Sequence, residues 1–263
     1  DAQESRGLGD VYKRQVHNLL CLLFEQQNKS KNVNVFRDLN HCCIYDAFMS
    51  LPPKNIEELM ERCALIAGLT LGQLADQCQL QLPANLQRDK GTVGQLLELV
   101  LGASSGSKAE PDFPHLGVEL KTLPVDRFGK PLESTYVCVA PLTDVAGLRW
   151  HDSWVCRKLS KVLFVPILAE RTIPLAERQI GSAFLWSPDA EQHALLQQDW
   201  EELMELIVLG GIDQIKGAHG KVLQLRPKAA NSKALTSAIG ADGQPIQTPV
   251  SYTHLRAHET PEH

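Results

Sequence analysis

Several signals are missing from this 263-residue chain, and each absence excludes a class of protein. No run of about 18 apolar residues occurs, which excludes a membrane-spanning helix. The seven cysteines are odd in number and form no C-x-x-C pair, so their spacing suggests neither a zinc site nor a disulfide framework, and a reducing cytoplasm fits best. The net charge of −5 excludes nucleic-acid binding through bulk positive charge but leaves room for a local basic surface.

Two further absences narrow the chemistry. The stretch GASSGSK (102–108) does not have the spacing of a phosphate-binding P-loop, which excludes a P-loop nucleoside triphosphatase. No metal-ligand spacing joins the internal histidines, so each is expected to lie at the surface or to be hydrogen-bonded on its own. These histidines are His115, His151, His193 and His219.

The two ends of the chain differ from its middle. Residues 1–48 and 250–263 show no regular period, and RGLGDVYKRQ (6–15) and VSYTHLRAHE (250–259) resemble translated sequencing-adapter read-through. We therefore expect both ends to be extraneous, with Met49 as the natural start. Residues 49–249 then form the credible domain, and the tail replaces the natural C-terminus.

Hydrophobic periodicity within residues 49–249 predicts an α/β protein with a mixed β-sheet flanked by helices. Asn55 followed by Glu58 resembles a capping box and predicts a helix start. Leu116–Leu123, a glycine-containing turn and Thr135–Val139 together predict a β-hairpin. The other expected elements are a short helix from Thr70, a helix over Thr92–Leu101, a buried strand over Val162–Ile167, a helix around Trp200–Val208, a strand over Lys221–Arg226 and a helix over Asn231–Ala238.

The motif with the clearest chemistry is Pro111–Asp112, six intervening residues, and then Glu119–Leu120–Lys121. Strand residues two apart project from the same face, so Glu119 and Lys121 point together, and Asp112 can converge on them from the preceding turn. Hard carboxylate oxygens hold Mg²⁺, and an ammonium group orients water or offsets charge on a phosphorane, which together suit phosphodiester hydrolysis. A solvated ion pair on an edge strand has the same pattern.

Glu98 is a candidate third acidic ligand. It lies inside the apolar run Leu96–Leu101, where a carboxylate is costly unless it is exposed or paired. A helix packed beside the strand could present it to the other two acids. Alternatively, Glu98 lies on the wet face of that helix.

A basic stretch near residue 226 is a candidate DNA-binding element. Arg226-Pro227-Lys228 lies between an expected strand and an expected helix, and Arg and Lys suit hydrogen bonding to guanine O6 and N7. An ordinary solvated loop has the same composition. Lys90, in RDKG (88–91), contacts a phosphate or only adds charge to a loop. The cations of the stretch are Lys216, Lys221, Arg226, Lys228 and Lys233.

Taken together, these segments closely resemble the MutH family of DNA mismatch-repair endonucleases, over about residues 50–249. The resemblance rests on eight stretches: RDKG (88–91), LLELVLGASSGSK (96–108), DF with LGVELKTLPVD (112–126), YVCVAPLT (136–143), RKLSKVLFVP (157–166), FLWSP (184–188), DWEELMELIVLG (199–210) and LRPKAANSKALT (225–236).

The resemblance implies a restriction-endonuclease-like fold with two arms around a DNA cleft, in a monomer. It implies an enzyme that cuts the unmethylated strand of hemimethylated GATC sites with Mg²⁺ and is activated by MutL, with MutS acting indirectly. By position, it implies that Glu98, Asp112 and Glu119 bind the metal and that Lys121 is catalytic. It also places Lys158 near the active site, Lys90 near the DNA, and Arg226 and Lys228 at the GATC bases.

The tail departs from the family pattern. Family members continue past the position of Val250 with a tyrosine-bearing strand and a closing helix, so Tyr252 is not assumed to be the tyrosine that probes adenine methylation. Two other functions also remain open from the sequence. One is a restriction endonuclease that cuts both strands of GATC without a partner, and the other is a DNA-binding module without catalysis.

Overall fold

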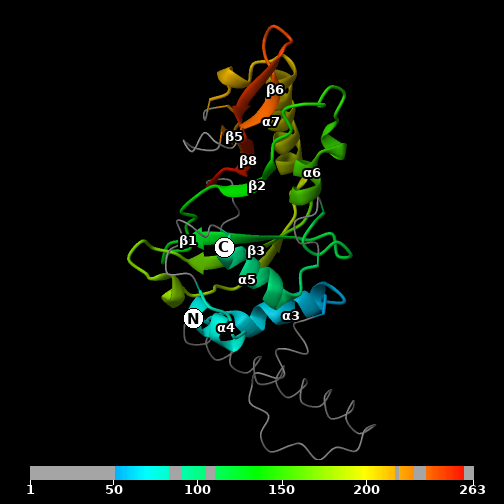
Figure 1. Cartoon of the computed structure of the whole chain (residues 1–263). Coiled ribbons are helices and arrows are strands. Elements are labelled where there is room, and N and C mark those ends of the chain that lie inside the picture. The colour runs from blue at the N-terminus through cyan, green and yellow to red at the C-terminus, as the bar shows by residue number, and fades with distance from the viewer. Residues whose placement is uncertain (1–50, 83–90, 105–109, 217–218, 228–234, 258–263) are drawn as a thin grey trace, which may run out of the picture.

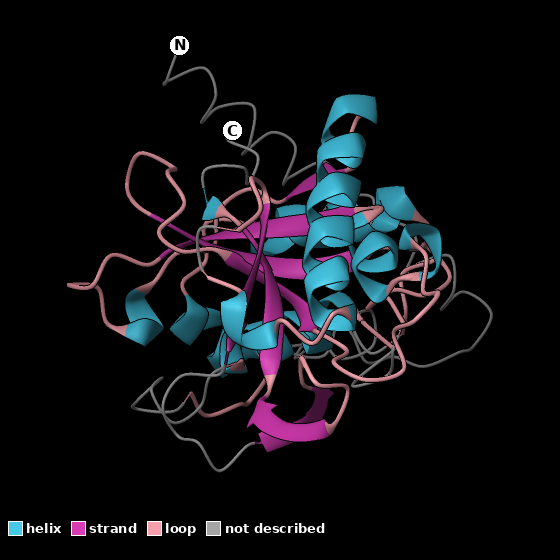
Figure 2. Cartoon of the chain, turned by 90° about the horizontal axis from the view of Figure 1, so that it is seen from above, coloured by secondary structure: helices cyan, strands magenta, loops and turns pink. Residues whose placement is uncertain are grey.

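The computed structural model describes residues 51–82, 91–104, 110–216, 219–227 and 235–257. Its strands form two three-stranded sheets and one hairpin, with helices packed outside them (Figures 1 and 2). No helix within these ranges is long and apolar enough to cross a membrane. The protein is therefore a mixed α/β fold, as predicted.

The lower half in Figure 1 holds one sheet and three helices. Its sheet has the order β1-β3-β4, with β1 parallel to β3 and β4 antiparallel to it. The strands are β1 (Glu119–Val125), β3 (Val162–Leu168) and β4 (Phe184–Trp186). The helices are α3 (Ile56–Ile66), α4 (Leu71–Gln77) and α5 (Thr92–Leu101).

The upper half in Figure 1 holds the second sheet, of order β2-β8-β5, and the hairpin β6-β7. Its strands are β2 (Thr135–Val139), β5 (Leu223–Pro227), β6 (Leu235–Ile239), β7 (Pro245–Pro249) and β8 (Ser251–Leu255). Its helices are α6 (Trp154–Leu159) and α7 (Ala190–Val208). The described residues also form short 3₁₀ turns, among them η1 (Trp150–Asp152), η2 (Leu175–Glu177) and η3 (Ile212–Gln214).

Local capping explains where α3, α4 and α7 begin, although α7 begins well before the predicted segment Trp200–Val208. The Asn55 side chain accepts the backbone N–H of Glu58 at 2.8 Å, which satisfies a donor that the first turn of α3 leaves unpaired. Thr70 begins α4, and Asp189 begins α7, each with a full capping box. The expected helix at 92–101 has the bounds predicted from its apolar spacing.

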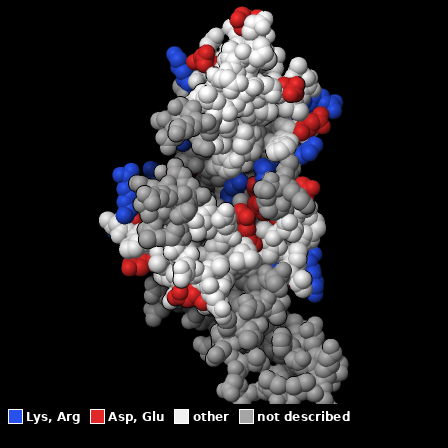
Figure 3. Space-filling view, in the orientation of Figure 1, with Lys and Arg blue, Asp and Glu red and all other residues white. Residues whose placement is uncertain are grey.

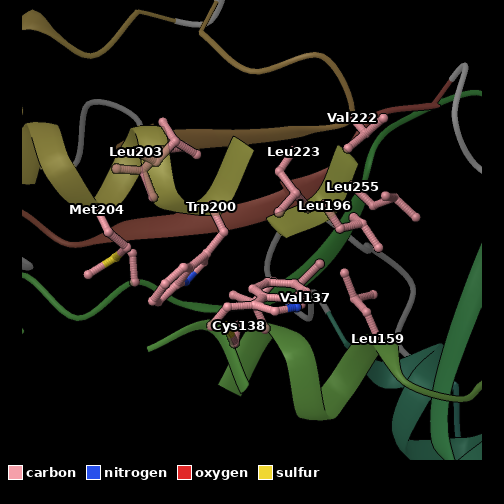
Figure 4. Packing of buried hydrophobic residues seen from close by; sticks show 14 of the residues in the cluster. Val137, Cys138, Leu159, Leu196, Trp200, Leu203, Met204, Val222, Leu223 and Leu255 are labelled. Carbon is pink, nitrogen blue, oxygen red and sulfur yellow. The ribbon is translucent and has the colours of Figure 1, made fainter. Parts of the chain in front are cut away.

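The β1–β3 pair separates two hydrophobic cores. Leu123 and Val125 belong to the upper core, whereas Leu120 belongs to the lower one. Figure 4 shows the upper core, where α7 packs on β5 and β8. Strands buried on both faces carry a continuous apolar run, which explains VLFVPIL in β3.

The predicted hairpin between Leu116–Leu123 and Thr135–Val139 is wrong. Both segments contain strands, but β1 pairs with β3 and β2 pairs with β8. The turn after β1 forms as expected, and Leu132 N–H still donates to Pro124 O at 2.9 Å before the chain leaves the strand. Pairing β1 with β3 buries apolar side chains on both faces, which a two-stranded hairpin cannot do.

The helix predicted over Asn231–Ala238 is also wrong in its described part. Residues 235–239 form β6, which pairs with β7 around Asp242–Gly243. Gly243 has a φ of +75°, and Asp-Gly is a strong hairpin signal because such turns need positive φ. The Asp-Gly turn signal outweighed the weak helical spacing, and residues 235–255 form strands and turns with no α-helix among them.

The tail contributes a central strand. β8 lies between β2 and β5, and Ser251, Thr253 and Leu255 are buried while Tyr252 and His254 are half-buried. The segment is therefore part of the fold, although the expected domain ended at residue 249. Its extraneous origin remains a prediction.

Asp199 in α7 should be essential to the upper half. Its carboxylate is 2% exposed and accepts the backbone N–H groups of Val222 and Leu223 at 2.6 and 2.8 Å. We expect Asp199→Ala to lower the free energy of unfolding by about 1–3 kcal/mol, because it leaves two buried backbone N–H groups without an acceptor. Urea unfolding measures this, and Glu202→Ala on the exposed face of α7 should change it far less.

Candidate active site

Four segments bring the predicted acids and lysines to the junction of the two halves. Glu98 comes from α5, Asp112 from the turn before β1, Glu119 and Lys121 from β1, and Lys158 from the last turn of α6. Glu119 and Lys121 continue the row of β1 side chains that faces the upper half. On the face of the molecule seen in Figure 3, acidic and basic side chains gather near the middle.

Glu119 is the centre of the group. Its side chain is 2% exposed, and Lys121 Nζ donates to its Oε1 at 2.7 Å. Lys158 Nζ lies 2.8 and 2.9 Å from Oε1 and Oε2. The prediction that Glu119 and Lys121 point together is confirmed, and the solvated ion pair is excluded because both partners are largely buried.

Asp112 is held against the strand by the backbone. Phe113 and Val118 each donate a backbone N–H to the carbonyl of the other, which closes a tight turn. The turn brings β1 back alongside Asp112, and Leu120 N–H donates to Asp112 Oδ2 at 2.7 Å. Burial raises the pKa of the Asp112 carboxyl, and the charge of Glu119 raises it further, whereas the Leu120 hydrogen bond lowers it. The site thus stores electrostatic repulsion that a cation would relieve.

Glu98 is half-buried and close enough to feel the same charges. Burial raises the pKa of its carboxyl first, and the charge of Asp112 raises it next, whereas Lys121 opposes the shift. Helix α5 buries Leu97 and Leu101 beneath the sheet, which turns Glu98 toward the other acids rather than fully into water. Glu98 is therefore half-buried rather than fully exposed, and its role as a metal ligand stays a prediction.

The acidic group fits a hard divalent cation by its donor chemistry, although the carboxylates do not form a closed cage. Among the described residues, the three acids do not bring one oxygen each within 4.8 Å of one another. Mg²⁺ needs only one or two protein carboxylates, because it retains water and takes phosphate oxygens. The donor set and its mutual repulsion suit such a cation.

The sequence did not reveal the aromatic lining of the site. The Tyr136 ring of β2 lies 5.5 Å from Lys121 Nζ, and the rings of Tyr252 and His254 meet it edge-on at 5.6 and 5.9 Å. Tyr136 is 45% exposed on a strand whose neighbours are buried. An outward-facing aromatic on a strand was the available signal, but only pairing of β2 with β8 assembles the cluster.

Comparison with known proteins then identifies the family. A sequence model described as "DNA mismatch repair enzyme MutH" matches residues 101–199. The DNA mismatch repair protein MutH of Shewanella sp. (strain MR-7) is 60% identical over 193 residues, which cover 73% of this chain and 86% of that protein. The MutH of Photorhabdus laumondii is 58% identical over 209 residues, covering 80% and 92%. The chain belongs to the MutH family.

The part of the chain that matches the MutH model contains most of the acid and lysine group. Asp112, Glu119, Lys121 and Lys158 lie inside it, whereas Glu98 lies just before it. The MutH of Serratia proteamaculans is 60% identical over 197 residues, or 75% of this chain and 86% of that protein. The resemblance seen in the sequence is thereby confirmed.

The predicted DNA-binding residues of this MutH family member are only partly described. Arg226 is exposed at the end of β5, opposite Tyr252, and its Nη2 donates to Ser134 Oγ at 3.0 Å. Arg226 therefore stands on the same sheet as the aromatic lining of the site. Lys90 and Lys228 lie outside the described residues, so their roles stay predictions.

Proposed function

We propose that this chain is a Mg²⁺-dependent endonuclease of methyl-directed mismatch repair that nicks the unmethylated strand at hemimethylated GATC sites. The observation that carries the proposal is the buried Glu119 carboxylate, held by Lys121 and Lys158, with Asp112 and Glu98 beside it. Membership in a family of DNA mismatch repair enzymes supports it. The family thus supports a role in mismatch repair, and the acidic group supports metal-dependent hydrolysis of DNA.

Glu98, Asp112 and Glu119 would hold Mg²⁺. The bound ion would polarise the scissile phosphate and lower the pKa of an attacking water. Lys121 would place its ammonium group where it orients that water or offsets the developing phosphorane charge. Lys158 would hold Glu119 in place, since it already binds both oxygens of that carboxylate.

The proposed DNA-binding mode follows the family fold. In a restriction-endonuclease-like arrangement, the two halves would act as arms on either side of the duplex, with the acidic group at their junction. Arg226 and Lys228 would reach GATC bases from the upper arm, and Lys90 would contact the backbone from the lower one. MutL, with MutS acting indirectly, would activate a monomeric enzyme.

A strand-resolved nicking assay on hemimethylated GATC DNA, with Mg²⁺ and with or without MutL, tests the proposal. We expect nicks only on the unmethylated strand, accelerated by MutL. Linear product from plasmid without MutL would instead indicate a restriction enzyme. Tight DNA binding without scission would indicate a non-catalytic module.

Lys228→Ala should separate base reading from phosphate binding. If Lys228 hydrogen-bonds a guanine, we expect affinity for GATC DNA to fall by about 1–3 kcal/mol, with little loss on unrelated DNA. Titration of labelled duplexes at fixed salt measures this. An equal loss on both duplexes would assign Lys228 to the phosphate backbone.

A further inference from the structure

A second group of metal-ligating side chains lies beside α6, on the side of the helix opposite Lys158. His151 of η1, Cys156 of α6 and His193 of α7 each place one ligand atom so that all three lie within 4.8 Å of one another. It is the one group of three His, Cys, Asp or Glu residues in the described ranges that meets this condition. The linear spacing gave no sign of it, because the ligands come from three elements.

In the structure, one nitrogen of His193 is already used by a hydrogen bond. Trp150 is 3% exposed, and its indole N–H donates to His193 Nε2 at 3.1 Å. The His151 and His193 rings stack with centroids 6.1 Å apart and planes 21° from parallel. The two imidazoles and the thiol therefore face a shared space at the η1–α6–α7 junction.

The donor set selects a different class of cation from the acidic site. Two imidazole nitrogens and one thiolate sulfur suit a borderline-soft ion such as Zn²⁺, whereas Mg²⁺ prefers oxygen. Tetrahedral Zn²⁺ with such ligands needs donor separations of about 3.3–3.8 Å. His151 is exposed, so rotation of its side chain can bring its ligand nitrogen closer to the other two ligand atoms.

We propose that His151, Cys156 and His193 form a zinc-class cation site, with water as the fourth ligand. Cation binding at His193 Nε2 would replace the Trp150 hydrogen bond with a metal–nitrogen bond. Cys156 and Lys158 are two residues apart on a helix and so project to nearly opposite sides. The cation would therefore tie η1 and α6 to α7 without entering the active site.

Co²⁺ is the probe, because a thiolate bound to Co²⁺ gives a near-ultraviolet charge-transfer band that oxygen and nitrogen ligands do not. Titrating the full, reduced chain with Co²⁺ should give a saturable band, with quenching of tryptophan emission and displacement by Zn²⁺. Excess Mg²⁺ should not displace it. Absence of the band overturns the proposal.

Variants assign the band to this site. Cys156→Ser should abolish it, and His151→Asn should weaken Co²⁺ binding at least about tenfold. Cys78→Ser is the matched control, since Cys78 is also half-buried but lies outside the group. A band that survives Cys156→Ser, or that disappears in Cys78→Ser, contradicts the assignment. Circular dichroism of each variant excludes unfolding as the cause.

Discussion

Lys121→Ala should nick hemimethylated GATC DNA about 10²–10³-fold more slowly than the unchanged chain, the usual effect of removing one donor that stabilises transition-state charge. The fold should persist, because Lys158 still binds both oxygens of the buried Glu119 carboxylate. Single-turnover nicking at saturating Mg²⁺ and DNA measures the change.

The control for this prediction is Lys130→Ala. Lys130 is exposed in the turn after β1, so its removal deletes the same charge without touching the acidic group. Its nicking rate should match that of the unchanged chain. A Lys121→Ala protein that nicks equally fast would remove Lys121 from the mechanism.

Asp112→Asn should produce a more stable but inactive protein. At neutral pH the ionised Asp112 is disfavoured by burial and by the charge of Glu119, and both raise the pKa of its carboxyl in the folded state. An amide removes the charge while its oxygen can still accept the Leu120 N–H. We expect a higher thermal midpoint without Mg²⁺ and nicking reduced at least about 100-fold.

The pH dependence has a definite sign. The folded-state pKa of Asp112 is raised, so between the unfolded-state and folded-state pKa values the folded chain binds more protons than the unfolded chain. Stability therefore falls as pH rises through this range. The advantage of Asp112→Asn should thus be complete above the raised pKa and should vanish below about pH 4, where both states are protonated. Thermal melts from pH 3.5 to 8 measure the difference.

Mg²⁺ should reverse this ranking. A ligand at 100 times its dissociation constant stabilises the folded state by about 2.7 kcal/mol, so Mg²⁺ should raise the midpoint of the unchanged chain but not that of Asp112→Asn. Asp76→Asn, on the exposed face of α4, is the matched control and should behave like the unchanged chain. Equal Mg²⁺ stabilisation of all three proteins would place the ion elsewhere.

Local chemistry in the sequence determined α3, α4, α5 and the pairing of Glu119 with Lys121, but it did not reveal α6 or the first part of α7. The caps at Asn55 and Thr70 involve residues three apart, and Glu119 and Lys121 share a strand face. These interactions lie within one element, so spacing alone predicts them. The family likewise follows from short motifs in the printed sequence.

Tertiary structure alone decided which strands pair and which distant side chains meet. β1 pairs with β3 rather than with β2, the next strand along the chain, because burial of both faces outweighs the short connection to β2. β8 pairs with β2 and β5, although the sequence of this segment did not predict a strand. Lys158 reaches Glu119 across 39 residues, and His193 reaches Trp150 across 43. Such contacts depend on how the two cores bury apolar surface as a whole, a property that no local spacing contains.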